Sequence, residues 1–189
     1  MQIHRLQGFV AGLLVAGGAW VGAQTKSAPV VAIPKSDIDA VLNYTGPEGA
    51  GADRQIRVVD LGAYKLGIGI LHSGATRAGA PVGAISHSQV TEAFYFVSGS
   101  GTLVTGGTVD NERAYPPETE FVRLAVGPSS GGVFKGGDRR HVGPGDVVVV
   151  PAGVPHGFDE IAEQLTYLSI RPDTNGVLPA GYVHPVLRK

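Results

Sequence analysis

The sequence predicts an all-β protein, a sandwich or barrel of short strands that forms one domain. Of its 189 residues, 29 are glycine and 13 are proline, and both residue types interrupt helices and build tight turns. Many short segments alternate apolar and polar side chains, which is the pattern of a half-buried strand. The chain length suits a single domain with a hydrophobic core of its own.

The expected strands lie between residues 55 and 171. They cover residues 55–61, 64–72, 82–87, 93–97, 101–105, 121–126, 139–142, 146–150 and 165–171. Glycines at residues 99 and 101 predict a hairpin between two of these strands. Four consecutive valines, 147–150, predict a strand that is buried on both faces. Residues 108–118 and 127–137 are rich in polar residues, proline or glycine, so we expect loops there.

The first 23 residues have the pattern of a secretory signal peptide. A short basic start precedes an apolar run from Phe9 to Ala23, and Val21-Gly22-Ala23 fits a cleavage site. The run is shorter than the roughly 20 residues that a membrane-spanning helix needs. We therefore expect residues 1–23 to be removed and the protein to be exported to the periplasm or the cell exterior.

The remaining chain divides into a lead-in and one barrel domain. Residues 24–54 are expected to be extended, apart from a short helix over 36–42 that Ser36 and Asp37 would cap. Residues 55–189 are expected to form the barrel, with a C-terminal tail from residue 172.

Composition excludes several classes of partner and chemistry. The net charge is −1 without a long run of one sign, which argues against nucleic acid or an anionic membrane surface as the main partner. The sequence contains no cysteine, so it has neither disulfides nor thiolate ligands. Any metal must be held by nitrogen and oxygen.

Two stretches of the sequence carry candidate metal ligands. In the first, His87 ends one expected strand and Glu92 begins the next. In the second, a turn with two prolines precedes His156 and fixes its direction. Two imidazoles and one carboxylate suit a divalent transition metal, and Fe, Mn, Ni, Cu and Zn are not distinguished.

The expected strands also define residues beside these ligands. Because residues two apart on a strand share a face, Ile85 lies beside His87, and Phe94 and Phe96 lie on the face of Glu92. These three apolar side chains are expected to line a pocket, and Gln89 in the intervening turn could reach it. Phe94 and Phe96 are in the first place expected core residues.

Together the two stretches resemble the two sequence motifs of the cupin superfamily. The first motif reads glycine, His-x-His, glutamate and glycine, and the second reads glycine, Pro-x-Gly, histidine and asparagine. The matching residues here are Gly79, Ile85-Ser86-His87, Glu92 and Gly99, then Gly145, Pro151-Ala152-Gly153, His156 and Glu160. The resemblance implies a small double-stranded β-helix, or jelly-roll, barrel of the cupin type.

The chain departs from these motifs at two positions. Ile85 stands in place of the first histidine, and Glu160 stands in place of the asparagine. The resemblance thus carries over a three-ligand site of His87, Glu92 and His156. His72, at the end of the preceding expected strand, is a candidate additional ligand in place of the missing histidine.

The sequence leaves two main functions open. The first is an exported metal-dependent enzyme of the dioxygenase, isomerase or lyase type that acts on a small molecule. The second is a non-catalytic cupin module that binds a small molecule or sugar. A purely structural oligomeric barrel is a third reading. A buried glutamate is costly without a positive charge beside it, which favours a metal.

Cupins are commonly dimers, and the resemblance implies a homodimer here. The apolar residues 29–33 could cover the partner's sheet as an added strand.

Overall fold

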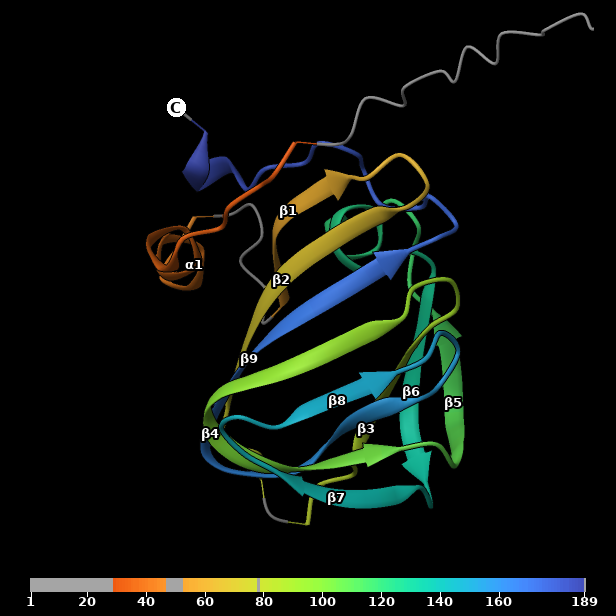
Figure 1. The fold of residues 1–189 in the computed structure, drawn as a ribbon. Coiled ribbons are helices and arrows are strands. Elements are labelled where there is room, and N and C mark those ends of the chain that lie inside the picture. The colour runs from red at the N-terminus through yellow and green to blue at the C-terminus, as the bar shows by residue number, and fades with distance from the viewer. Residues whose placement is uncertain (1–28, 47–52, 78, 189) are drawn as a thin grey trace, which may run out of the picture.

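In a computed structural model, residues 29–46, 53–77 and 79–188 are described, and they fold into a small double-stranded β-helix barrel with a helix on its outer surface (Figure 1). This confirms the predicted fold class.

The strand order is β1-β2-β9-β3-β6-β5, and β4 pairs with β7, β8 and β9. The helical elements are α1 (Lys35–Leu42), the π-helix η1 (Phe121–Val126) and the 3-10 helix η2 (Pro185–Leu187). The strands are β1 (Asp53–Asp60), β2 (Lys65–Gly74), β3 (Gly83–His87), β4 (Glu92–Thr105), β5 (Thr108–Ala114), β6 (Ser129–Lys135), β7 (Asp138–Val142), β8 (Val147–Val150) and β9 (His156–Asp173).

Two long strands, β4 and β9, hold the barrel together. They pair antiparallel over nearly the whole of β4, and three register shifts let them bend from one side of the barrel to the other (Figure 1). The predicted hairpin at residues 99–101 is therefore wrong. Gly99 has a φ of +73° and lies at one of the bulges, so a positive φ marks a bend within a strand and not a turn between two strands.

Both predicted loops are also wrong, because each contains a strand. Residues 108–114 form β5 and residues 129–135 form β6, and these two strands pair with each other. β5 is the end strand of its sheet path, and nearly all its side chains are exposed. An exposed edge strand has no apolar alternation, which removes the sequence signal on which the prediction depended.

The predicted strand at 121–126 is instead η1. Val122, Ala125 and Val126 are buried by this single helical turn. A short apolar run fits a strand or a buried helical turn equally well by its periodicity alone, so the wrong prediction came from that ambiguity.

The valine strand β8 is buried on one face only, contrary to expectation. Val147 and Val149 are 64% and 61% exposed, whereas Val150 is buried. β8 pairs only with β4, and one face of this pair is the outside of the barrel. The expectation of burial on both faces was wrong because it inferred the position of the strand from its composition.

The core consists of two clusters on opposite faces of the sheet. Inside the barrel, Phe94 and Phe96 are core residues, as predicted. They pack with six further buried side chains: Leu103, Val142, Val150, Ile161, Leu165 and Tyr167. On the outside, α1 buries Val41 against Ile56 and Ile70. The predicted helix at 36–42 is confirmed by α1, but the predicted capping by Ser36 and Asp37 is wrong, because the N-cap is Pro34 and no side chain caps the helix.

The N-terminal predictions are only partly within the described residues. The signal peptide predicted over residues 1–23 lies outside them. Residues 29–33 precede α1 without strand structure, and Val30 is 98% exposed. Within the described ranges, no helix is both long enough and apolar enough to cross a membrane.

Candidate metal site

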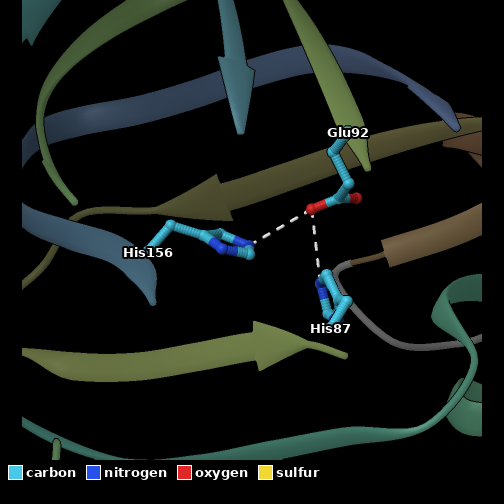
Figure 2. Close-up of side chains that lie close together, drawn as sticks. All are labelled: His87, Glu92 and His156. Carbon is cyan, nitrogen blue, oxygen red and sulfur yellow. Dashed lines mark ion pairs between the residues drawn. The ribbon is translucent and has the colours of Figure 1, made fainter. Parts of the chain in front are cut away.

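Three strand ends place His87, Glu92 and His156 at one point inside the barrel. His87 is the last residue of β3, Glu92 is the first of β4 and His156 is the first of β9. Glu92 Oε2 lies 3.3 Å from His87 Nε2 and 3.2 Å from His156 Nε2 (Figure 2). One ligand atom from each of the three residues lies within 4.8 Å of the other two. The structure therefore brings together the three ligands that the sequence singles out.

The size of this cluster fits a metal ion. The three residues are only 4%, 2% and 6% exposed. Nitrogen and oxygen ligands lie about 2.0–2.2 Å from a transition metal, so two adjacent ligand atoms are roughly 2.8–3.6 Å apart, depending on whether the geometry is octahedral or tetrahedral. Both nitrogen–oxygen separations to Glu92 fall within that range.

The hydrogen bonds of His87 determine which of its nitrogens carries the proton. The Ser129 hydroxyl donates its single proton to the carbonyl oxygen of Gly127, at 2.8 Å. The same oxygen lies 2.8 Å from His87 Nδ1, so it can only accept there, and Nδ1 must donate. In a neutral His87, Nε2 consequently presents a lone pair to Glu92.

The nitrogen that carries the proton in His156 is determined in the same way. Its Nδ1 lies 3.1 Å from the carbonyl oxygen of Val154, which can only accept a hydrogen bond. Its Nε2 is therefore also unprotonated when the ring is neutral. Metal-binding histidines in proteins commonly donate their second N–H to a carbonyl or hydroxyl in this manner.

The pKa values of His87 and Glu92 disfavour protonation of this cluster. Burial lowers the pKa of His87 and so disfavours its charged form. Burial alone would raise the pKa of Glu92, but its interactions, of which the charge of Arg171 is the largest, hold that pKa well below its usual range. When both rings are neutral, two nitrogen lone pairs and one carboxylate oxygen face each other, and a cation would satisfy all three.

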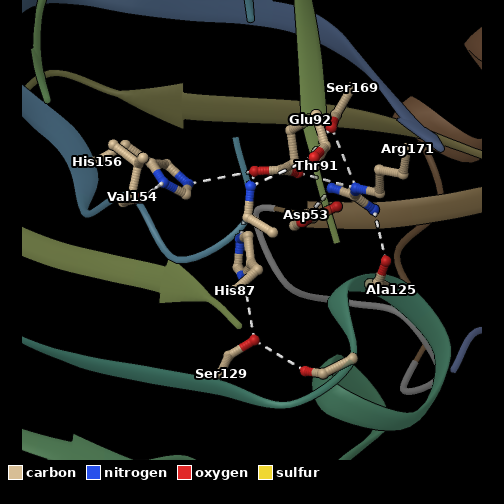
Figure 3. A network of polar contacts seen from close by, with 12 residues as sticks. Asp53, His87, Thr91, Glu92, Ala125, Ser129, Val154, His156, Ser169 and Arg171 are labelled. Carbon is tan, nitrogen blue, oxygen red and sulfur yellow. Dashed lines mark hydrogen bonds and ion pairs between the residues drawn. The ribbon is translucent and has the colours of Figure 1, made fainter. Parts of the chain in front are cut away.

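Arg171 is the functional residue that the sequence analysis missed. It is fully buried, and its guanidinium connects the site to β1 and to η1 (Figure 3). Its Nε donates to Glu92 Oε1 at 2.9 Å, its Nη1 to Gln55 and to the carbonyl oxygen of Ala125, and its Nη2 to Asp53. The sequence does contain a signal, because Arg171 shares the inward face of β9 with Ser169 and the buried Tyr167.

Arg171 supplies the positive charge that the buried Glu92 requires, but it does not neutralise the whole cluster. Burial lowers the pKa of Arg171, yet the charges of Asp53 and Glu92 more than compensate and raise it, so the guanidinium stays charged. Two carboxylates then face one guanidinium. When both are ionised, the cluster has a net negative charge, which favours a cation at the histidines.

Aromatic rings surround the two histidines. The Phe94 ring meets that of His156 edge-on, with 5.8 Å between centroids. Phe121 of η1 meets His87 edge-on at 6.2 Å and in turn contacts Tyr115. These contacts give the site the apolar walls that the sequence led us to expect, and they show that η1 forms one of them.

The other predicted site residues lie in different environments. Ile85 pairs with His156 across β3 and β9 and is half-buried, so it borders the site without offering a ligand atom. Phe96 lies in the barrel core, and Gln89 is exposed.

His72 is not brought to the three ligands. Its Nδ1 bonds to Thr166 Oγ1 at 2.8 Å, on the face of β9 opposite to Tyr167 and Arg171. It lines a groove of about 640 Å³ between α1 and the outer surface of the sheet.

Neither a protein-family model nor a curated protein matches the chain. Solved structures match it in fold. A Bacillus halodurans protein has a TM-score of 0.44 and 15% identity, over 82% of this chain and 89% of that one. A Klebsiella pneumoniae protein with a double-stranded β-helix domain has a TM-score of 0.40 and 15% identity, over 75% and 94%. The DMSP lyase DddQ from Ruegeria pomeroyi has a TM-score of 0.40 and 14% identity, over 77% and 58%. At 14–15% identity the similarity concerns the fold alone.

Proposed function

We propose that this protein binds one divalent transition metal through His87, Glu92 and His156, and that it is a metal-dependent enzyme acting on a small molecule. One observation carries the proposal. Hydrogen bonds make Nδ1 the donor in both histidines, so that in the neutral rings two Nε2 lone pairs converge with a carboxylate oxygen.

The chain's own residues define what such a site can do. Three ligands leave several coordination positions free, and Ile85, which pairs with His156 across β3 and β9, offers no fourth ligand atom. Phe94 and Phe121 limit the access of water to the histidines. A bound metal would supply Lewis-acid chemistry if it were zinc or manganese, and oxygen chemistry if it were iron.

Metal analysis tests this proposal directly. We expect the purified full chain to hold about one transition-metal ion, and His87→Ala and His156→Ala each to reduce binding at least tenfold, because each removes one of three ligands. His141→Ala is the matched control, since His141 is an exposed histidine on β7. Less than about a tenth of an ion per chain, with no uptake of added Fe, Mn, Ni or Zn, would contradict the proposal.

A second candidate is a non-catalytic module that binds a small molecule or sugar. Arg171 already compensates the charge of Glu92, so the barrel interior does not depend on a metal alone. This function predicts that ligand-induced thermal stabilisation survives chelation and survives both histidine substitutions. Loss of that stabilisation in either case would favour the enzyme.

Export remains part of the proposal and is supported by the pattern of residues 1–23. The mature protein should begin at Gln24, since Val21-Gly22-Ala23 is the expected cleavage site. Mass spectrometry of the protein recovered from the periplasm or medium measures this. An intact N-terminus at Met1 would contradict it.

A further inference from the structure

We infer that Arg171 is a positioning residue of the metal site, which restricts Glu92 to ligation through a single oxygen. The inference rests on the proposed metal binding and adds to it a residue outside the predicted ligand set. It follows from the division of the Glu92 carboxylate into two ends with different partners, which Figure 3 shows.

The Oε1 end of Glu92 is fully occupied by protein donors. Arg171 Nε donates to it at 2.9 Å and the Ser169 hydroxyl donates at 2.7 Å. These two donors also contact each other, because Arg171 Nε lies 3.1 Å from Ser169 Oγ. A carboxylate oxygen accepts about two hydrogen bonds, so Oε1 has no lone pair left for a metal. Oε2 alone faces the two histidines.

Arg171 is itself held too firmly to release Oε1. Its two other nitrogens bond to Asp53 and Gln55 of β1 and to Ala125 of η1. Every one of these contacts is buried or nearly so, and the planar guanidinium makes them simultaneously. Rotation of Glu92 would break a network that includes four segments of the fold.

The same network links the site to its apolar wall. Ala125, whose carbonyl accepts from Arg171, belongs to the helical turn that places Phe121 against His87. Arg171 therefore fixes both a ligand and the element that borders another ligand. Glu92 is correspondingly unsuited to detach from the metal and carry a proton.

Arg171→Lys separates geometry from charge. Lysine keeps the positive charge but loses the fork that reaches Glu92, Asp53 and Gln55 together. The control is Arg57→Lys, which alters another partly buried arginine–aspartate pair, between β1 and α1. Binding of Co²⁺ alone to the metal-free full chain is measured by titration, together with its visible absorption spectrum.

We expect Arg171→Lys to bind Co²⁺ about 10- to 100-fold more weakly, with weaker visible absorption as Oε1 joins the coordination, while Arg57→Lys resembles the wild type. Wild-type affinity and spectrum in Arg171→Lys would overturn the inference and leave the proposed function intact. No Co²⁺ binding by the wild type would instead overturn the proposed function, and the inference with it.

Ser169→Ala provides a second, milder test, in case the lysine variant does not fold. It removes one of the two donors to Oε1 and leaves Arg171 in place. We expect a weakening of Co²⁺ binding of about three- to tenfold and a spectral change in the same direction. An unchanged affinity and spectrum in this variant would contradict the inference.

Discussion

His87 couples the stability of the metal-free barrel to pH. Burial lowers its pKa in the folded state, so below pH 6.5 the unfolded chain takes up a proton there that the folded chain does not. Stability therefore falls as the pH drops through this range. The loss cannot exceed about 1.4 kcal/mol per pH unit for one group.

The prediction is measured by urea unfolding between pH 7.5 and 5.5 in the presence of a chelator. His87→Gln should flatten the pH dependence, because glutamine does not titrate. His141→Gln, an exposed control on β7, should keep the wild-type slope. A wild-type slope in His87→Gln would show that other groups cause the pH dependence.

At the scale of single residues, the candidate ligands could be predicted from sequence and Arg171 could not. His87, Glu92 and His156 are recognisable because metal ligation needs particular side chains at particular spacings. Arg171 is defined only by its neighbours, and two of them, Asp53 and Gln55, lie on a strand more than 100 residues earlier. The expectation of a positive charge near Glu92 was correct, but the sequence pattern led us to expect a metal alone.

Among the elements, β4 depends on a glycine at its central bulge. Gly99 has a φ of +73°, and a Cβ built there would lie 1.9 Å from the carbonyl oxygen of Gln164 in β9. Gly99→Ala should therefore destabilise the fold by about 1–3 kcal/mol through backbone strain, with a further cost for moving β9. Chemical denaturation measures this difference.

The matched control for that substitution is Gly74→Ala at the end of β2, where a Cβ meets no atom within 4 Å. It should change stability by less than about 1 kcal/mol. Equal effects of the two substitutions would contradict the role assigned to the bulge.

Strands with alternating apolar residues, such as β1, β2 and β3, could be predicted because one of their faces is buried and the other is not. β5 and β6 could not, since β5 is exposed and β6 is rich in glycine. Long-range pairing made them strands, which local sequence cannot report. The same limit explains why one bent strand, β4, was read as two.

On the scale of the whole molecule, the homodimer remains a prediction from the cupin resemblance. We expect light scattering of the mature chain to give twice the monomer mass. Val30→Asp should shift the equilibrium towards monomer, because it places a charge in the apolar segment 29–33 that would cover the partner. A monomer in the unsubstituted protein would contradict the prediction.

The contacts of Arg171 also bear on how the chain reaches its native state. They join residues 79 and 118 positions apart, so the chain must close long loops before the cluster exists. A metal ion that needs His87, Glu92 and His156 together would bind only after the barrel is complete. It would then slow unfolding while leaving the folding rate nearly unchanged, so that the bound ion would give kinetic stability to a protein that has no disulfides.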